Sequence, residues 1–188
     1  MSEPVPVDPE VATALLRSHL EDFFANSPRV RQGGWAWEIA DDPLIAIVQI
    51  PAKRTDSADI DGYTLRLDAT YYDTWPVSAT FVEAHDGGWR RARLGSKAFP
   101  LLCGSPGAPP GGAVGFEFAL HDDYSFTGGT DQLICFSYNF GYYISGHNPT
   151  DNQRWREGVD RLDATLTRIH TALISPAYAG PSVQAEAA

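Results

Sequence analysis

The sequence is poor in positive charge. Its 188 residues carry 14 Lys and Arg against 24 Asp and Glu, a formal net charge of −10. Because nucleic-acid affinity depends largely on Lys and Arg side chains that neutralise phosphates, this balance argues against a nucleic-acid partner. It argues equally against binding to an anionic membrane surface. The acidic residues are spread along the chain, so we interpret them as a solvated surface.

Long apolar runs and cysteine are also scarce. There is no run of about 18 apolar residues, so no membrane-spanning helix is predicted. The first residues lack the basic and apolar regions of a signal peptide, and we expect a cytoplasmic protein. The two cysteines, Cys103 and Cys135, are too few for a disulfide framework, and in a reducing compartment we expect free thiols. The Gly-Gly pairs lack the context of a phosphate-binding loop.

The apolar fraction of 43%, with 12% aromatic residues, is ample for a folded core and favours a sheet-rich one. Asp8-Pro9-Glu10 is typical of a helix start, and we predict a helix over 9–25. The apolar run 44–50 is typical of a central strand buried on both faces. Residues 63–72 alternate between apolar and polar, which predicts a strand with one buried face.

The remaining segments complete an α+β pattern. Further strands are predicted at 35–39, 77–84 and 89–94, which gives an antiparallel meander of four or five strands. Turn formers predict loops over 100–115 and 121–130. Trp155, Val159 and Leu162 begin a helical apolar stripe, so we expect a helix over 151–174 with Asp151 as its cap.

Composition also suggests how the chain is divided. Residues 1–8 are interrupted by proline and are expected to be loose. Residues 9–174 are expected to form a single α+β domain: a flanking helix, the meander, an irregular segment and a last helix. Residues 175–188 have the composition of a disordered tail.

In this order of elements the chain resembles the ubiquitin-conjugating enzyme superfamily, its divergent prokaryotic members in particular. The Tyr-Tyr-Asp-Thr-Trp-Pro segment at 71–76 matches the element that follows the third strand of that family. The stretch 133–136 looks like the one that bears the cysteine, and Trp155 with the helix after it matches the family's C-terminal part. The resemblance covers residues 9–174.

The resemblance implies an activity. Cys135 would receive the C-terminus of a ubiquitin-like protein from an activating enzyme, hold it as a thioester and pass it to an amine. The implied partners are that modifier and its activating enzyme, and the chain itself would need no cofactor. His121 and Asp123 would support the transfer, because they stand where the family has a His-Pro-Asn motif. His121 lies 14 residues before Cys135.

The departure from that motif has a chemical consequence. The family's asparagine helps to stabilise the oxyanion that forms when an amine attacks the thioester. A carboxylate at Asp123 would repel a developing negative charge. Asn139 or Asn148 could take the place of that asparagine.

The residues themselves leave alternatives open. Cys135 is the leading nucleophile, since a thiolate is strongly nucleophilic near neutral pH. Equally, the stretch 133–136 could be core packing, because free cysteine is among the most buried residues. Cys103 is the rival nucleophile in a Gly/Pro-rich loop, although no basic residue is closer to it in sequence than Lys97.

Two histidines could assist a thiol. Asp122 or Asp123 could orient His121 as a general acid or base. A pair of Cys135 with either His121 or His147 would also suit a thiol hydrolase. A metal site from these side chains is conceivable by ligand type, but their spacing matches no zinc pattern.

Aromatic residues offer a last candidate surface. Trp35 with Trp37, and the cluster at 138–143, could form a ligand-binding face or pack as core and cross-strand pairs. Taken with the family resemblance, the expected function is that of a conjugating enzyme that uses Cys135. The alternative is a catalytically inactive binding module on the same fold, in which Cys135 is a core residue.

Overall fold

A computed structural model describes residues 4–102, 118–126 and 129–183 of the chain. Its helices are α1 (Pro9–Asn26), α2 (Phe140–Ile144), α3 (Leu162–Leu173) and the short 3-10 helix η1 (Val30–Gln32). Its strands are β1 (Ala36–Ile39), β2 (Ile45–Lys53), β3 (Ile60–Asp68), β4 (Ser78–His85), β5 (Gly88–Arg91), β6 (Pro100–Leu102), β7 (Ala119–Phe126), β8 (Gly129–Cys135) and β9 (Tyr178–Pro181). The predicted α+β class is confirmed.

The meander forms one sheet in the order β1-β2-β3-β4-β5, with each strand antiparallel to the next. As predicted, β2 is buried on both faces, because apolar residues occupy nearly every position. In β3 the predicted alternation is confirmed: Tyr63, Leu65 and Leu67 are buried, and the residues between them are partly exposed. The strand ends at Asp68, and the chain then turns instead of continuing to residue 72.

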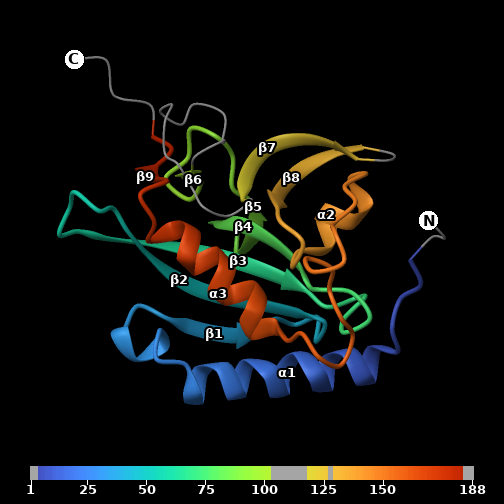
Figure 1. Cartoon of the computed structure of the whole chain (residues 1–188). Coiled ribbons are helices and arrows are strands. Elements are labelled where there is room, and N and C mark those ends of the chain that lie inside the picture. The colour runs from blue at the N-terminus through green and yellow to red at the C-terminus, as the bar shows by residue number, and fades with distance from the viewer. Residues whose placement is uncertain (1–3, 103–117, 127–128, 184–188) are drawn as a thin grey trace.

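The N-terminal helix begins as the sequence predicts. The Asp8 side chain caps α1 by accepting hydrogen bonds from the backbone N–H groups of Glu10, at 2.9 Å, and Val11, at 3.3 Å. Its buried face enters the hydrophobic core together with α3. Figure 1 shows α3 lying across the meander and α1 running along the edge near β1. No helix in the described parts of the chain is both long and apolar enough to cross a membrane.

The loop predicted over 121–130 is wrong, because β7 and β8 form an antiparallel hairpin there. Two aspartates among the residues that suggested a loop, and a third just after them, lie near arginines in and just after β5. Arg91 of β5 contacts Asp123 and Asp131, and Arg93 contacts Asp122. Figure 1 shows the hairpin curving away from the meander beside β4 and β5, with α2 next to β8.

The helix predicted over 151–174 is shorter, since α3 begins only at Leu162 and its cap position is Arg161 instead of Asp151. The preceding segment is held by contacts of its own. Trp155 donates a hydrogen bond from Nε1 to the backbone oxygen of Asp73 at 2.8 Å. Gly158 takes a positive φ of 68°, which interrupts a helix. Val159, expected on the apolar face, is 61% exposed.

The segment after residue 174 also differs from the expectation of a disordered tail. Within it, β9 pairs with β6, and Tyr178 is buried. Tyr63 donates to the Tyr178 hydroxyl, which donates to the Asp61 carboxylate; both O···O distances are 2.6 Å. The predicted loop over 100–115 contains β6 at its start, and its other residues lie outside the described part of the chain.

Candidate functional site

Cys135 is the last residue of β8. Its neighbours Ile134 and Phe136 are buried, and alternation puts the Cys135 side chain on the opposite face, where it is partly exposed. The register places Cys135 opposite Ala119, and His121 opposite Leu133. Because paired residues share a face, His121 is the diagonal neighbour of Cys135 across the hairpin.

His147 completes a pair with the thiol. Its Nε2 atom lies 3.5 Å from the Sγ atom of Cys135. The residue follows α2 after a tight turn at Gly146, whose φ of +83° favours glycine. Sequence reasoning left the choice between His121 and His147 open, and the structure shows the hydrogen-bond contact with His147.

Ser145 decides which nitrogen of His147 carries the hydrogen. The Ser145 hydroxyl donates to the backbone oxygen of Tyr142 at 2.9 Å, so its only hydrogen is already engaged. Its oxygen lies 2.7 Å from Nδ1 of His147 and can therefore only accept a hydrogen bond from it. The neutral imidazole then has a lone pair on Nε2, directed at the Cys135 thiol. We call Cys135, His147 and Ser145 the Cys135 site.

Aromatic rings hold the imidazole in place. Tyr142 stacks on His147 with ring centroids 4.5 Å apart, and Tyr124 lies on a second side at 5.8 Å. Tyr124 also contacts His121, with ring centroids 5.0 Å apart, so one ring touches both histidines. Burial, and secondarily the charge of His147, lower the pKa of His121 below 6.5. His121 is therefore mainly neutral at pH 7, on the face of the hairpin that carries Cys135.

The two aspartates after His121 point elsewhere. Asp123 lies 3.8 Å from an Arg91 guanidinium nitrogen, and Asp122 lies 3.6 Å from Nε of Arg93. Neither carboxylate hydrogen-bonds to His121 within the part of the chain that the structure describes. The expected orienting role of these aspartates has no contact to support it, and the catalytic role of Asp123 stays a prediction.

Asn139 is not available as a substitute for the family's asparagine. It is 2% exposed, its Oδ1 accepts from the Ala79 backbone N–H at 2.9 Å, and its Nδ2 donates to the Ile134 backbone oxygen at 2.7 Å. Buried Gln132 joins β8 to Phe81 of β4 in the same way. These two amides fix the strand that ends at Cys135, and no local pattern in the sequence indicates that they are buried.

The other candidates are placed as follows. Asn148 is exposed, and Cys103 lies outside the described residues. Trp35 packs against Phe23 of α1, with ring centroids 5.3 Å apart, and Tyr143 packs against Trp75 at 5.0 Å. The two aromatic clusters thus have separate packing partners. The described residues contain no group of three His, Cys, Asp or Glu side chains placed to hold a metal ion.

Comparison with known proteins gives no match: no family model fits the chain, and no curated protein or solved structure is significantly similar to it. The resemblance to the ubiquitin-conjugating superfamily therefore stays a prediction. What the site can do must be argued from its own geometry. A partly exposed thiol, a lone pair 3.5 Å away and a hydroxyl that fixes the tautomer are the parts of an activated nucleophile.

Proposed function

We propose that the chain carries the C-terminus of a ubiquitin-like protein as a thioester on Cys135 and transfers it to an amine. The observation that carries this proposal is the contact between the Cys135 thiol and Nε2 of His147. The N-terminal helix followed by an antiparallel meander supports it, because the family that the chain resembles has a helix and then a four-stranded meander; the meander of this chain has five strands. A thioester carrier needs a reduced thiol, which is consistent with a cytoplasmic location and an activating enzyme as partner.

The first step is an exchange of thioesters. Nε2 of His147 takes the proton of the Cys135 thiol, and the thiolate attacks the acyl carbon of the modifier on its activating enzyme. The new bond joins Sγ of Cys135 to that carbon. The bond from the carbon to the sulfur of the activating enzyme breaks, and that sulfur leaves as a thiolate.

The second step transfers the acyl group. An amine attacks the thioester carbon, the C–N bond forms, and Cys135 leaves as a thiolate. His147, having passed its first proton to solvent, takes the proton that the amine loses. A neutral His121 on the same face can donate a hydrogen bond to the oxyanion, a role that a carboxylate cannot fill.

The same contact favours a second candidate, a thiol hydrolase. In that case water would attack the acyl-Cys135 intermediate, and no acceptor protein would be needed. The third reading, an inactive binding module with Cys135 in the core, is less favoured because the Cys135 side chain is partly exposed.

The test uses tagged chain recovered from its own host and run on gels with and without a reducing thiol. We expect a slower band that disappears on reduction and is absent in Cys135→Ala. Its mass would identify the modifier. Cys103→Ala is the matched control, because it leaves Cys135 as the only cysteine, and we expect it to keep the band.

Other outcomes decide between the candidates. A band lost only in Cys103→Ala would overturn the site. If no band forms while the activating partners are present, and the purified chain hydrolyses an activated thioester in a Cys135-dependent way, the hydrolase is correct. If neither activity is found, the binding module is the better account.

A further inference from the structure

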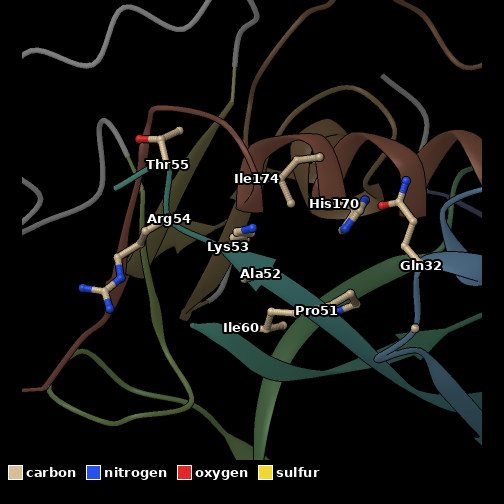
Figure 2. Close-up of a pocket in the computed structure, with 10 residues that line it drawn as sticks. Gln32, Pro51, Ala52, Lys53, Arg54, Thr55, Ile60, His170 and Ile174 are labelled. Atoms are coloured by element: carbon tan, nitrogen blue, oxygen red, sulfur yellow. The ribbon is translucent and has the colours of Figure 1, made fainter. Parts of the chain in front are cut away.

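A pocket of about 270 Å³ lies at the end of β2 opposite to the Cys135 site, between η1 and the end of α3. It is lined by Gln32, Gly33, Pro51, Ala52, Lys53, Arg54, Thr55, Ile60, His170 and Ile174. We call it the His170 pocket. Figure 2 shows the imidazole of His170 reaching from α3 into the space above Pro51 and Ile60. Its volume suits a compact small molecule.

His170 is the unusual member of this lining, because it is a titratable side chain that is only 3% exposed. The Arg29 guanidinium lies 2.9 Å from its Nδ1 atom. Arginine can only donate, so Nδ1 accepts and the hydrogen of the neutral ring is on Nε2. Burial, and then the charge of Arg29, lower the pKa of His170 to about 4, which keeps the ring neutral at pH 7.

Nε2–H is therefore a fixed donor. In the described part of the chain it has no hydrogen-bond partner. It is therefore the polar atom of His170 that can bind a ligand in the pocket. Arg29 is itself anchored, since a second nitrogen donates to the Thr171 hydroxyl at 3.1 Å. The fully buried side-chain atoms without a hydrogen-bond partner in the described residues are Nε1 of Trp35, Nε of Arg54 and Oδ1 of Asp122. Nε2 of His170 is therefore open to the solvent of the pocket, where an acceptor on a ligand would replace water.

The charge of the lining points to an anion. Lys53 and Arg54 contribute two cations, and the described lining residues include no aspartate or glutamate. This is notable in a chain with a net charge of −10. Figure 2 shows the Arg54 guanidinium directed away from His170, so Lys53 is the cation placed to contact a ligand beside Nε2.

The remaining walls are apolar and open to solvent. Ile60 is 67% exposed and Ile174 is 40% exposed, although both are large hydrophobic side chains, and Pro51 and Ala52 form a buried floor. Exposed apolar walls around a polar end fit a ligand with one charged group and a hydrophobic body.

We propose that the His170 pocket binds a small organic carboxylate. The carboxylate accepts a hydrogen bond from Nε2 of His170 and pairs with the Lys53 ammonium, while the apolar body of the ligand lies against Ile60 and Ile174. The proposal is independent of the function proposed for Cys135, because the two sites share no residue.

The test is a titration of the full-length protein with benzoate. Binding is measured by calorimetry and by the imidazole NMR signals of His170. We expect saturable shifts of those signals, and binding of the neutral isostere benzamide to be about tenfold weaker or worse. Lys53→Gln should weaken benzoate binding about fivefold. Lys97→Gln, the matched control at an exposed lysine outside the pocket, and Cys135→Ala should leave it unchanged.

Four results would overturn the proposal. They are the absence of a saturable shift at His170, equal binding of benzamide, equal binding of inorganic phosphate, and equal effects of the Lys53 and Lys97 substitutions. The benzoate and benzamide comparison is made on the unmodified protein, so it decides the question even if a substituted chain fails to fold.

Discussion

The imidazole rings of His147 and His170 are held in opposite tautomers. At the Cys135 site, Nδ1 of His147 donates to the Ser145 hydroxyl, so Nε2 presents a lone pair to the thiol. At the His170 pocket, Nδ1 of His170 accepts from the Arg29 guanidinium, so Nε2 presents a hydrogen. The first Nε2 can take a proton, and the second can only bind an acceptor.

The difference shows that the hydrogen-bond partner of Nδ1 decides whether Nε2 of the same ring carries a lone pair or a hydrogen. A hydroxyl whose hydrogen is engaged elsewhere selects the basic tautomer, as it does at Ser145. A guanidinium selects the donor tautomer and also opposes a second proton, as Arg29 does. Burial strengthens the contrast, because His147 is partly exposed whereas His170 is almost fully enclosed.

The largest effect is expected when the basic Nε2 of His147 is removed from the Cys135 site. In His147→Asn the Cys135 thiol loses its base, and we expect acyl transfer from an activated thioester to fall about 100-fold or more. Alkylation of Cys135 by iodoacetamide near pH 7 should slow as well, since a free thiol is only a few per cent ionised there. Both rates are measured in a Cys103→Ala background, in which Cys135 is the only cysteine.

His121→Asn is the matched control, because His121 shares the face of Cys135 but hydrogen-bonds to neither Cys135 nor His147 in the described residues. We expect a smaller loss in this variant, confined to the acyl-transfer step. Equal alkylation rates in the wild type and His147→Asn would contradict the assignment of His147 as the base.

The second prediction concerns His170 and pH. The folded protein holds its pKa at about 4, while in the unfolded chain it returns to about 6.5. Between these values the unfolded state binds the extra proton, so the free energy of unfolding decreases as the pH falls from about 7 to 4. The contribution of this one group is at most about 3 kcal/mol.

Urea unfolding of the wild type and His170→Gln at several pH values measures that contribution. Glutamine can accept the Arg29 hydrogen bond and cannot be protonated, so we expect a shallower pH dependence in the variant. His85→Gln, at a side chain that is 47% exposed, is the control and should follow the wild type. Parallel curves for the wild type and His170→Gln would show that His170 does not resist protonation.

The parts of the fold that could be predicted are those governed by local sequence. The Asp8-Pro9 helix start, the apolar run of β2 and the alternation of β3 depend on near neighbours and were confirmed. The hairpin of β7 and β8 is contacted by Arg91 of β5 and by Arg93 just after it, and β9 depends on a partner strand far back in the chain. No local pattern carries that information.

The candidate site divides in the same way. Cys135 and His147 were recognised as chemically suitable, but only the structure shows that Nε2 lies 3.5 Å from the thiol. Ser145 was not predicted as a site residue. The local pattern Ser-Gly-His could have indicated it, because a serine two residues before a histidine can place its hydroxyl against the imidazole. The His170 pocket left no such signal, because Arg29, Lys53 and His170 are far apart in sequence.

A third, smaller effect is expected at Ser145. In Ser145→Ala the His147 tautomer is no longer fixed, and we expect acyl transfer to fall about tenfold, as for loss of one hydrogen bond that orients a base. Ser145→Thr keeps a hydroxyl and should restore most of the rate. The nitrogen NMR signals of His147 report the tautomer directly and should change only in the alanine variant. If they do not, stacking on Tyr142 is what orients the ring.

The smallest effect is expected at Asp123, where the family resemblance and the structure diverge. Its ion pair with Arg91 is 3.8 Å long and partly exposed, so Asp123→Asn should change the free energy of unfolding by no more than about 0.5 kcal/mol. Acyl transfer should change by less than about twofold, as in Asp131→Asn, which removes a second partner of the same arginine. A large loss of transfer in Asp123→Asn alone would mean that this carboxylate turns toward the thiol when the modifier is bound. In that case the order of residues in the sequence would describe the working site better than the contacts of the free chain.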